Sequence, residues 1–301
     1  MQNSFPLSAS HTAPVSADPN RPLGHVSAPV TVPDQGSFTV DVPNVARVYD
    51  VLLGGKDNFE ADRRAAAKLL EAVPDAAVAA RDNRAFLCRA VRYLAREAGV
   101  SQFLDIGTGL PTVGSVHEIA RACDVRRLRV VYADYDAVVV RHAEALLADS
   151  LNVAVVRADL RRPRDLLAEP AVWAMIDLAQ PVAVLLVAVL HFLDDTEDPW
   201  AIVSQLKDRM APGSYLVISH VTADHITLQA AQQARDAYKG ASAPGVPRTR
   251  AQVARFFGGL ELVSPGLVSV SSWRPDEIDP APGPALFYAG VGRKTGPGRP
   301  R

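Results

Sequence analysis

The most informative segment of this 301-residue chain is Phe103-Leu-Asp-Ile-Gly-Thr-Gly-Leu-Pro-Thr112. An apolar strand runs through Asp105 into a turn that carries Gly107 and Gly109, and a helix is expected to begin near Thr112. Glycines in such a turn allow the backbone to bend tightly and to approach a ligand. In an α/β sheet, a turn of this kind lies at the carboxyl ends of the strands, where ligands bind.

Short apolar stretches alternate with helical stretches from this turn onward. This alternation is typical of a parallel sheet with helices on both faces. The run Val182–Leu190 is apolar on both faces, as a central parallel strand requires. The predicted strands are Gln102–Ile106, Arg129–Asp134, Val153–Arg157, Val182–Leu190 and Tyr215–Ser219, with helices between them over Ala137–Asp149 and Pro199–Met210.

The last third of the chain predicts two helices and two more strands. A long helix is expected over Asp224–Lys239, and Thr249 begins a short one with Gln252 as a possible partner in a capping box. The strands are expected over Leu262–Val270 and Ala285–Gly292. Two late strands after five parallel ones indicate a terminal antiparallel hairpin. The predicted fold class is α/β, with a mostly parallel seven-stranded sheet.

Residues 41–99 carry helical patterns before the sheet begins. Asn44 is suited to cap a helix that starts at Val45, and Gly54-Gly55 is expected to stop it. Further helices are predicted over Glu60–Ala72 and Asp75–Ala98. We therefore expect an N-terminal helical block over 41–99 and a separate α/β domain over 100–293.

The two ends of the chain differ in composition from the rest. Residues 1–40 are rich in Pro and Ser and hold only three charged side chains. Such a segment buries too little apolar surface to offset the entropy lost on ordering, so a disordered arm is expected. Residues 294–301 predict a disordered basic tail. Its Gly298-Arg-Pro-Arg301 motif is only a weak sign of DNA contact.

Composition excludes several classes of protein. Lys and Arg number 32 against 33 Asp and Glu, so a surface built for nucleic acid is not expected. The longest apolar run has nine residues, whereas a membrane-spanning helix needs about 20. No signal peptide is recognised, and Cys88 and Cys123 offer no metal-ligand spacing. A cytoplasmic protein without a metal, a membrane anchor or nucleic acid is the resulting expectation.

The glycine turn favours an adenosine ligand over a dinucleotide. The dinucleotide motif is G-x-G-x-x-G, but position 112 holds Thr where the third glycine belongs. Asp105 stands two residues before the first glycine, and Asp134 ends the next predicted strand. An acid at the end of the second strand can accept hydrogen bonds from ribose hydroxyls.

These features resemble the S-adenosylmethionine (SAM) site of class I methyltransferases, which have a Rossmann-like sandwich fold. More closely, the chain resembles an actinobacterial family of SAM-dependent methyltransferases whose substrate is unassigned. Pro111 replaces a glycine common in class I enzymes, but this family has the same Gly-Leu-Pro-Thr sequence. The resemblance covers about residues 40–293 and is carried by 43–63, 83–86, 103–112, 184–193 and 214–224.

The resemblance implies roles for particular residues toward SAM. The glycine turn would hold the methionine end, Asp134 the ribose, and Tyr135 and Asp159 the adenine. The helical block over 41–99 would act as a lid on the cofactor, and Arg81 or Arg84 would reach the methionine carboxylate. The cofactor residues so implied are Tyr49, Gly55, Lys56, Asn58, Arg84, Asp105, Gly107, Thr108, Gly109, Asp134, Tyr135, Asp159, Leu160 and Ala188.

The expected function is methyl transfer to a small-molecule acceptor that the sequence does not identify. His191 and Tyr49 are the candidates to assist if the acceptor is a hydroxyl or an amine. His191 is equally compatible with a core histidine that holds a loop. One alternative function is a SAM-binding regulator that transfers nothing, which would lack an acceptor cavity. Another is an NAD-dependent oxidoreductase, which the glycine spacing disfavours.

Overall fold

The computed structural model describes residues 40–111, 114–147, 150–243, 245–277, 283 and 285–296. The expected arm therefore lies outside the described residues except for Val40, and so does the tail from residue 297. Lys294 belongs to the ordered chain, because its N–H donates to the Ser214 carbonyl at 2.8 Å and its carbonyl accepts from Gly213 N at 2.7 Å. Placing the start of the tail at residue 294 was wrong.

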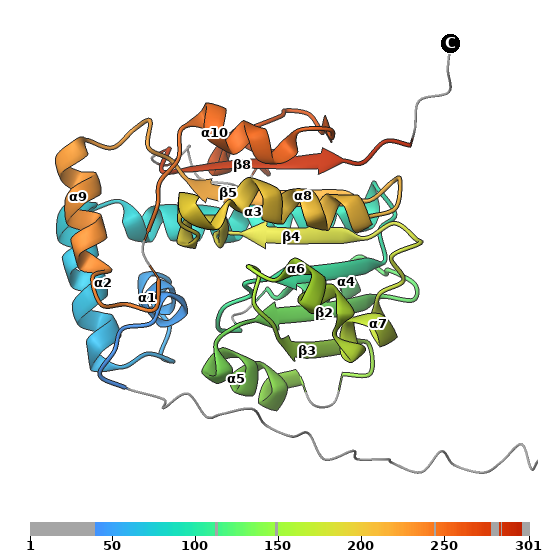
Figure 1. Ribbon diagram of the computed structural model, residues 1–301, viewed down its shortest axis with the longest axis horizontal. Coiled ribbons are helices and arrows are strands. Elements are labelled where there is room, and N and C mark those ends of the chain that lie inside the picture. The colour runs from blue at the N-terminus through green and yellow to red at the C-terminus, as the bar shows by residue number, and fades with distance from the viewer. Residues whose placement is uncertain are drawn as a thin grey trace, which may run out of the picture. The chain divides into compact units, whose positions relative to one another are not determined.

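An eight-stranded sheet forms the centre of the chain, in the order β3-β2-β1-β4-β5-β8-β6, with β7 also paired to β8 (Figure 1). Strands β1 to β5 are parallel, and β8 runs antiparallel to β5, β6 and β7. The strands are β1 Gln102–Ile106, β2 Arg129–Asp134, β3 Val153–Arg157, β4 Ala183–Val187, β5 Tyr215–Val221, β6 Glu261–Leu262, β7 Val268–Ser269 and β8 Phe287–Arg293.

The expected edge strand Leu262–Val270 is divided into β6 and β7. The chain between them carries Pro265, which has no N–H for a sheet ladder. This division accounts for eight strands where seven were predicted, and the antiparallel end of the sheet is as expected.

Helices cover both faces of the sheet. Helices α3 and α4 pack with η4 against one face, and α6, α7, α8 and α10 pack with η3 against the other. The helices are α1 Val45–Leu52, α2 Glu60–Ala72, α3 Ala76–Arg96, α4 Val116–Arg121, α5 Ala137–Leu147, α6 Pro163–Ala168, α7 Pro170–Met175, α8 Pro199–Arg209, α9 Leu228–Ala237 and α10 Arg250–Ala254. The 3-10 turns are η1 Leu190–Phe192, η2 Asp195–Glu197, η3 Arg255–Phe257 and η4 Val270–Ser272.

Strand alternation sorts side chains between the two cores. In β1, Leu104 and Ile106 belong to the core under α8, whereas Phe103 belongs to the core under α3. Successive side chains of a strand point to opposite faces, which gives this two-residue period. Because both faces are covered, the central strand β4 is apolar throughout.

The helical block before the sheet divides into two parts. Helix α3 is a core element, since Phe86 is fully buried and meets Trp273 edge-on at 5.4 Å between ring centroids. Helix α2 instead packs against α1 and α9, which lie together at one end of the sheet (Figure 1). Only α1, α2 and the segments joining them are therefore available to form a lid.

Candidate functional site

A cleft opens at the carboxyl ends of β1, β2 and β4, with α1 along one side. Its empty volume, including the opening to solvent, is about 1250 Å³. Residues from seven separate stretches of sequence converge there. Of the cofactor residues expected from the sequence, those lining the cleft are Tyr49, Arg84, Asp105, Gly107, Thr108, Gly109, Asp134, Tyr135, Asp159, Leu160 and Ala188.

Asp105 is a buried carboxylate on the floor of this cleft. It lies near the end of β1, and Thr108 Oγ1 donates to its Oδ2 at 3.1 Å. Burial raises the pKa of Asp105 to about 6, although the Arg84 guanidinium and the Thr108 hydrogen bond oppose this shift. At neutral pH the carboxylate is ionised in an apolar setting, so a cationic group of a ligand would be attracted to it.

Asp134 is the second buried carboxylate and ends β2. Its Oδ2 accepts from Gly109 N and its Oδ1 from Asp136 N, each at 3.0 Å. Burial raises the pKa of this carboxyl to about 6 as well, against the effect of these backbone hydrogen bonds. A carboxylate has about four lone-pair sites, so acceptor capacity remains for ligand hydroxyls.

Gly107 is required by the packing of the turn. Its φ of +72° lies in the left-handed region, and an added Cβ would come within 2.3 Å of Val189 Cγ2. Val189 follows Ala188, a non-glycine residue with φ of +55°. The positive φ ends β4 at Val187, so the predicted strand Val182–Leu190 was too long at its carboxyl end; β4 begins at Ala183, one residue later than predicted.

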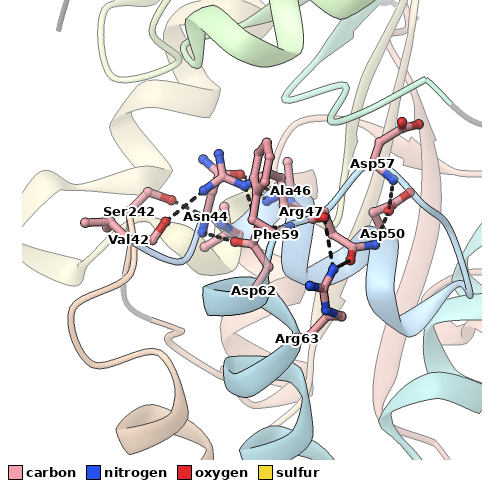
Figure 2. A network of polar contacts seen from close by, with 12 residues as sticks. Val42, Asn44, Ala46, Arg47, Asp50, Asp57, Phe59, Asp62, Arg63 and Ser242 are labelled. Atoms are coloured by element: carbon pink, nitrogen blue, oxygen red, sulfur yellow. Dashed lines mark hydrogen bonds and ion pairs between the residues drawn. The ribbon is translucent and has the colours of Figure 1, made fainter. Parts of the chain in front are cut away.

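The start of α1 is fastened to the sheet by a polar network (Figure 2). Asn44 caps the helix, because its Oδ1 accepts from Ala46 N at 2.8 Å, and its own N–H donates to Asp62 Oδ1 at 2.8 Å. Its Nδ2 donates to Asp136 Oδ2 in the turn after β2. Arg47 forms a buried ion pair with Asp62 at 2.7 Å. This network fixes the end of α1 beside the cleft.

Gly55, Lys56 and Asn58, in the loop after α1, do not line the cleft, contrary to the expectation. Asp50 organises this loop by accepting from Asp57 N at 3.0 Å and from Asn58 Nδ2 at 2.8 Å (Figure 2). A Cβ on Gly55 would overlap the Asp50 carboxylate at 1.9 Å, so the glycine provides room for it. Lys56 is exposed. Asp50 itself lines the cleft, so Gly55 and Asn58 affect the cleft only through their contacts with Asp50.

Two buried polar atoms stand without partners on residues that line the cleft. They are Asn83 Oδ1 and Arg84 Nε, which have no hydrogen bond within the described chain. Arg84 Nη2 donates to the Gly114 carbonyl at 3.1 Å, which leaves its Nε available to an anionic ligand group. The alternative candidate, Arg81, is exposed and does not line the cleft.

Tyr135, Asp159 and Leu160 lie at the outer end of the cleft. Arg161 Nε donates to Asp159 Oδ1 at 2.9 Å, and its guanidinium lies 5.7 Å from the centroid of the Tyr135 ring. Ser242, from the loop after α9, also lines the cleft here, and its Oγ accepts from Val45 N at 3.2 Å. An aromatic ring and a carboxylate beside each other are suited to a flat heterocycle.

The two catalytic candidates differ in position, since Tyr49 lines the cleft and His191 does not. The Tyr49 hydroxyl donates to the Ala80 carbonyl at 3.0 Å and accepts from Asn83 Nδ2 at 2.8 Å. Burial also raises the pKa of Tyr49, so it is a poor proton carrier. His191 does not line the cleft. It lies in η1, on the wall of a second cavity that Tyr49 and Phe192 share with the cleft.

Several residues that build the site were not predicted from the sequence. Arg248, which is fully buried, donates to the carbonyls of Leu190 at 3.0 Å and Leu193 at 2.8 Å, and so holds the turn that carries His191. It pairs with Asp195 at 2.6 Å. Asp50 and Ser242 are the other cases. The position of Asp50 just before Gly54-Gly55 was available as a clue, but the contacts of Arg248 and Ser242 are between distant segments.

This sheet, with its acid-lined glycine turn and antiparallel end, defines the class I methyltransferases. More particularly, the chain belongs to the S-adenosyl methyltransferase family, whose sequence profile matches residues 33–295. The cofactor is therefore SAM. The actinobacterial family expected from the sequence is confirmed.

Two solved structures are similar over most of the chain. A Thermobifida fusca protein, provisionally named a methyltransferase, is 44% identical with a TM-score of 0.79, covering 85% of this chain and 96% of that one. A DUF574 family protein from Streptomyces avermitilis is 38% identical with a TM-score of 0.78, covering 85% of this chain and all of that one. No protein of curated function matches the sequence.

The residues present suit SAM. The methionine end of SAM carries one ammonium and one carboxylate, which match the Asp105 carboxylate and the unpartnered Arg84 Nε. The free acceptor sites of Asp134 match a ribose diol. Among the described helices, none is both long and apolar enough to cross a membrane.

Proposed function

We propose that this protein catalyses methyl transfer from SAM to a small-molecule acceptor. The observation that carries the proposal is the second cavity beside the cofactor cleft, separated from it by Tyr49 and Phe192. A regulator that only binds SAM has no need of a second cavity at this position. SAM would supply a methyl group on a positively charged sulfur. An electron pair of the acceptor would bond to the methyl carbon while the carbon–sulfur bond breaks, and S-adenosylhomocysteine would leave.

In this proposal the chain acts mainly by binding and positioning. Asp105 and Arg84 hold the charged methionine end, and Asp134 accepts hydrogen bonds from the ribose. Tyr135, Asp159 and Leu160 form the walls around the adenine. The strained turn at Ala188 shapes the wall between these groups and the acceptor. Alignment and exclusion of water account for much of the rate in such displacements, so no strong acid or base is needed.

The test has a binding part and a transfer part. Calorimetric titration should show SAM and S-adenosylhomocysteine binding, and NAD not binding. SAM with a labelled methyl group is then incubated with the protein and a bacterial metabolite extract. Label in a small-molecule product supports the proposal, and D134N should greatly reduce its formation. Label only in protein or nucleic acid, or SAM binding without any transfer, would contradict it.

A further inference from the structure

The second cavity is predominantly apolar. It lies between α2, α3, α9 and η1, and its wall includes Leu52, Leu69, Ala80 and Phe287. Only four of its described lining residues have polar side chains, namely Tyr49, His191, Arg235 and Tyr238. Of these, Tyr49 uses its hydroxyl for two internal hydrogen bonds and Arg235 is exposed.

His191 lines this cavity and carries a buried polar atom without a partner among the described residues. The residue is only 6% exposed, and its Nδ1 has no hydrogen bond within the described part of the chain. An unpaired buried polar group typically costs about 1–3 kcal/mol, which a bound ligand can recover by pairing with it. Besides the Tyr238 hydroxyl, His191 is therefore the polar contact that this apolar cavity offers.

The neighbours of His191 keep its ring neutral. His220 Nδ1 lies 2.7 Å from the Val221 carbonyl and so carries the proton, which makes its Nε2 the acceptor for Arg248 Nη1 at 3.0 Å. Burial, together with nearby His220 and the Arg248 cation, lowers the pKa of His191 well below 6.5. A neutral imidazole has one donor and one acceptor, so it can pair with a hydroxyl or an amine.

Aromatic rings line the cavity around this polar atom. Phe192 lies 4.4 Å from the His191 ring between centroids and Phe287 lies 5.9 Å from it, while Tyr238 lies 6.1 Å from Phe192. Aromatic pairs at such separations favour further flat rings in offset or edge-on contact. A charged ligand would lose its hydration here without gaining a buried partner of opposite charge.

We propose that this cavity binds the methyl acceptor, and that the acceptor is an uncharged, flat, mainly apolar molecule whose single hydroxyl or amine hydrogen-bonds to His191. Its role as the acceptor site rests on the proposed function, since the cavity adjoins the cofactor cleft at Tyr49 and Phe192. His191 acts as the residue that selects and orients the ligand.

The test uses the full chain and three probes of similar size, which are 2-naphthol, naphthalene and 2-naphthoate. Fluorescence titration should show saturable binding of 2-naphthol. One neutral hydrogen bond predicts affinity about three- to tenfold higher for 2-naphthol than for naphthalene. The charged 2-naphthoate should bind at least about tenfold more weakly than 2-naphthol. In H191L, the preference for 2-naphthol over naphthalene should disappear.

Two variants of α9 test the location without altering His191. Ala231 lines the cavity, so A231F should weaken binding of both uncharged probes. Gln229 is exposed on the same helix and does not line the cavity, so Q229F is the matched control and should bind them as the wild type does. Absence of saturable 2-naphthol binding, or equal binding by A231F and Q229F, would overturn the inference.

SAM titration of the same samples separates this inference from the proposed function. SAM binding should be unchanged in H191L, A231F and Q229F, because none of these residues lines the cofactor cleft. If SAM binds but 2-naphthol does not, the inference about the cavity fails and the proposed function stands. If 2-naphthol binds to the cavity but no acceptor is ever methylated, the proposed function fails instead.

Discussion

Asn44 and Asp136 are 92 residues apart in the sequence, and the side-chain amide of Asn44 donates a hydrogen bond to Asp136 Oδ2. The other oxygen of Asp136 accepts from Val138 N at 2.7 Å in the first turn of α5. One carboxylate thus joins the cap of α1 to the exit of β2, next to Asp134. The position of the helix beside the cofactor cleft depends on this contact.

Removing this contact should weaken both α1 and the cofactor site. N44A loses a helix cap, which typically costs about 0.5–2 kcal/mol in the free energy of unfolding. SAM affinity should fall with it, because α1 lines the cleft. T227A is the matched control, since Thr227 caps α9 by accepting from Ala230 N at 3.1 Å. Urea unfolding and SAM calorimetry compare them, and equal SAM affinity in the two variants would disprove the role of Asn44.

D134N should lower SAM affinity by roughly tenfold to a hundredfold. It removes the charge and one acceptor, and hydrogen bonds to charged groups contribute about 1.5–3 kcal/mol. S-adenosylhomocysteine should lose a similar factor, because both ligands share the ribose. Calorimetry measures both ligands, with D208N as the control, since Asp208 is exposed on α8. Unchanged affinity in D134N would refute the ribose assignment.

As the pH changes, SAM affinity should change in the opposite direction to the stability of the unliganded protein. Asp105 and Asp134 each have a pKa of about 6, above the usual 3.8, because they are buried. SAM affinity needs both carboxylates ionised, so it should fall as the pH drops through 6. The unliganded protein holds these protons more tightly than the unfolded chain does, so the contribution of both groups to stability rises over the same pH change.

Thermal unfolding with and without SAM, from pH 5 to 8, measures both effects. The increase in melting temperature caused by SAM should shrink toward pH 5. D105N should show a weaker pH dependence of this increase than the wild type. An increase that does not change with pH would mean that neither carboxylate contacts the cofactor.

G107A should destabilise the protein more than G99A does. Both glycines have positive φ, +72° and +68°, but only Gly107 has a neighbour, Val189, that an added Cβ would overlap. G99A therefore measures the cost of φ alone, which is typically about 1–2 kcal/mol. G107A should exceed it in urea unfolding and also weaken SAM binding. The double variant G107A/V189A should recover part of the loss, and no recovery would contradict the packing explanation.

K56A should leave SAM affinity within about twofold of the wild type, because the Lys56 side chain is exposed and lies away from the cleft. D50A should weaken SAM binding and loosen the following loop, since it removes the acceptor used by Asp57 N and Asn58. Calorimetry with limited proteolysis of the loop compares the two variants. A large loss of SAM affinity in K56A would instead show that Lys56 belongs to the cofactor site.

The order of strands and helices was largely predictable because it follows from local patterns. Helix Glu60–Ala72 and the strands Gln102–Ile106, Arg129–Asp134 and Val153–Arg157 have the predicted bounds. Predicted helix boundaries were wrong where contacts between distant segments set them. Helix α9 begins at Leu228 rather than Asp224, because the Asp224 side chain accepts from Arg250 N at 2.8 Å and from the Tyr288 hydroxyl at 3.0 Å.

The candidate site was predictable where its residues follow a strand directly. Asp105 and Asp134 reach the same edge of the sheet because β1 and β2 are parallel neighbours. Which residues of the N-terminal helical block line the cleft was not predictable from the sequence. Gly55, Lys56 and Asn58 carry the residue types of a binding loop, but the contacts of Gly55 and Asn58 stay within the same segment, chiefly with Asp50.

The parallel sheet, the glycine turn and the two acids at its edge follow from local sequence, because strand polarity and backbone conformation are encoded within a few residues. Other features appear only once the chain is folded: Tyr49 hydrogen-bonds to Asn83, His191 lines a second cavity, and Asn44 contacts Asp136. These relationships join segments far apart in the chain. Their geometry depends on how helices pack against the sheet, which no local pattern specifies.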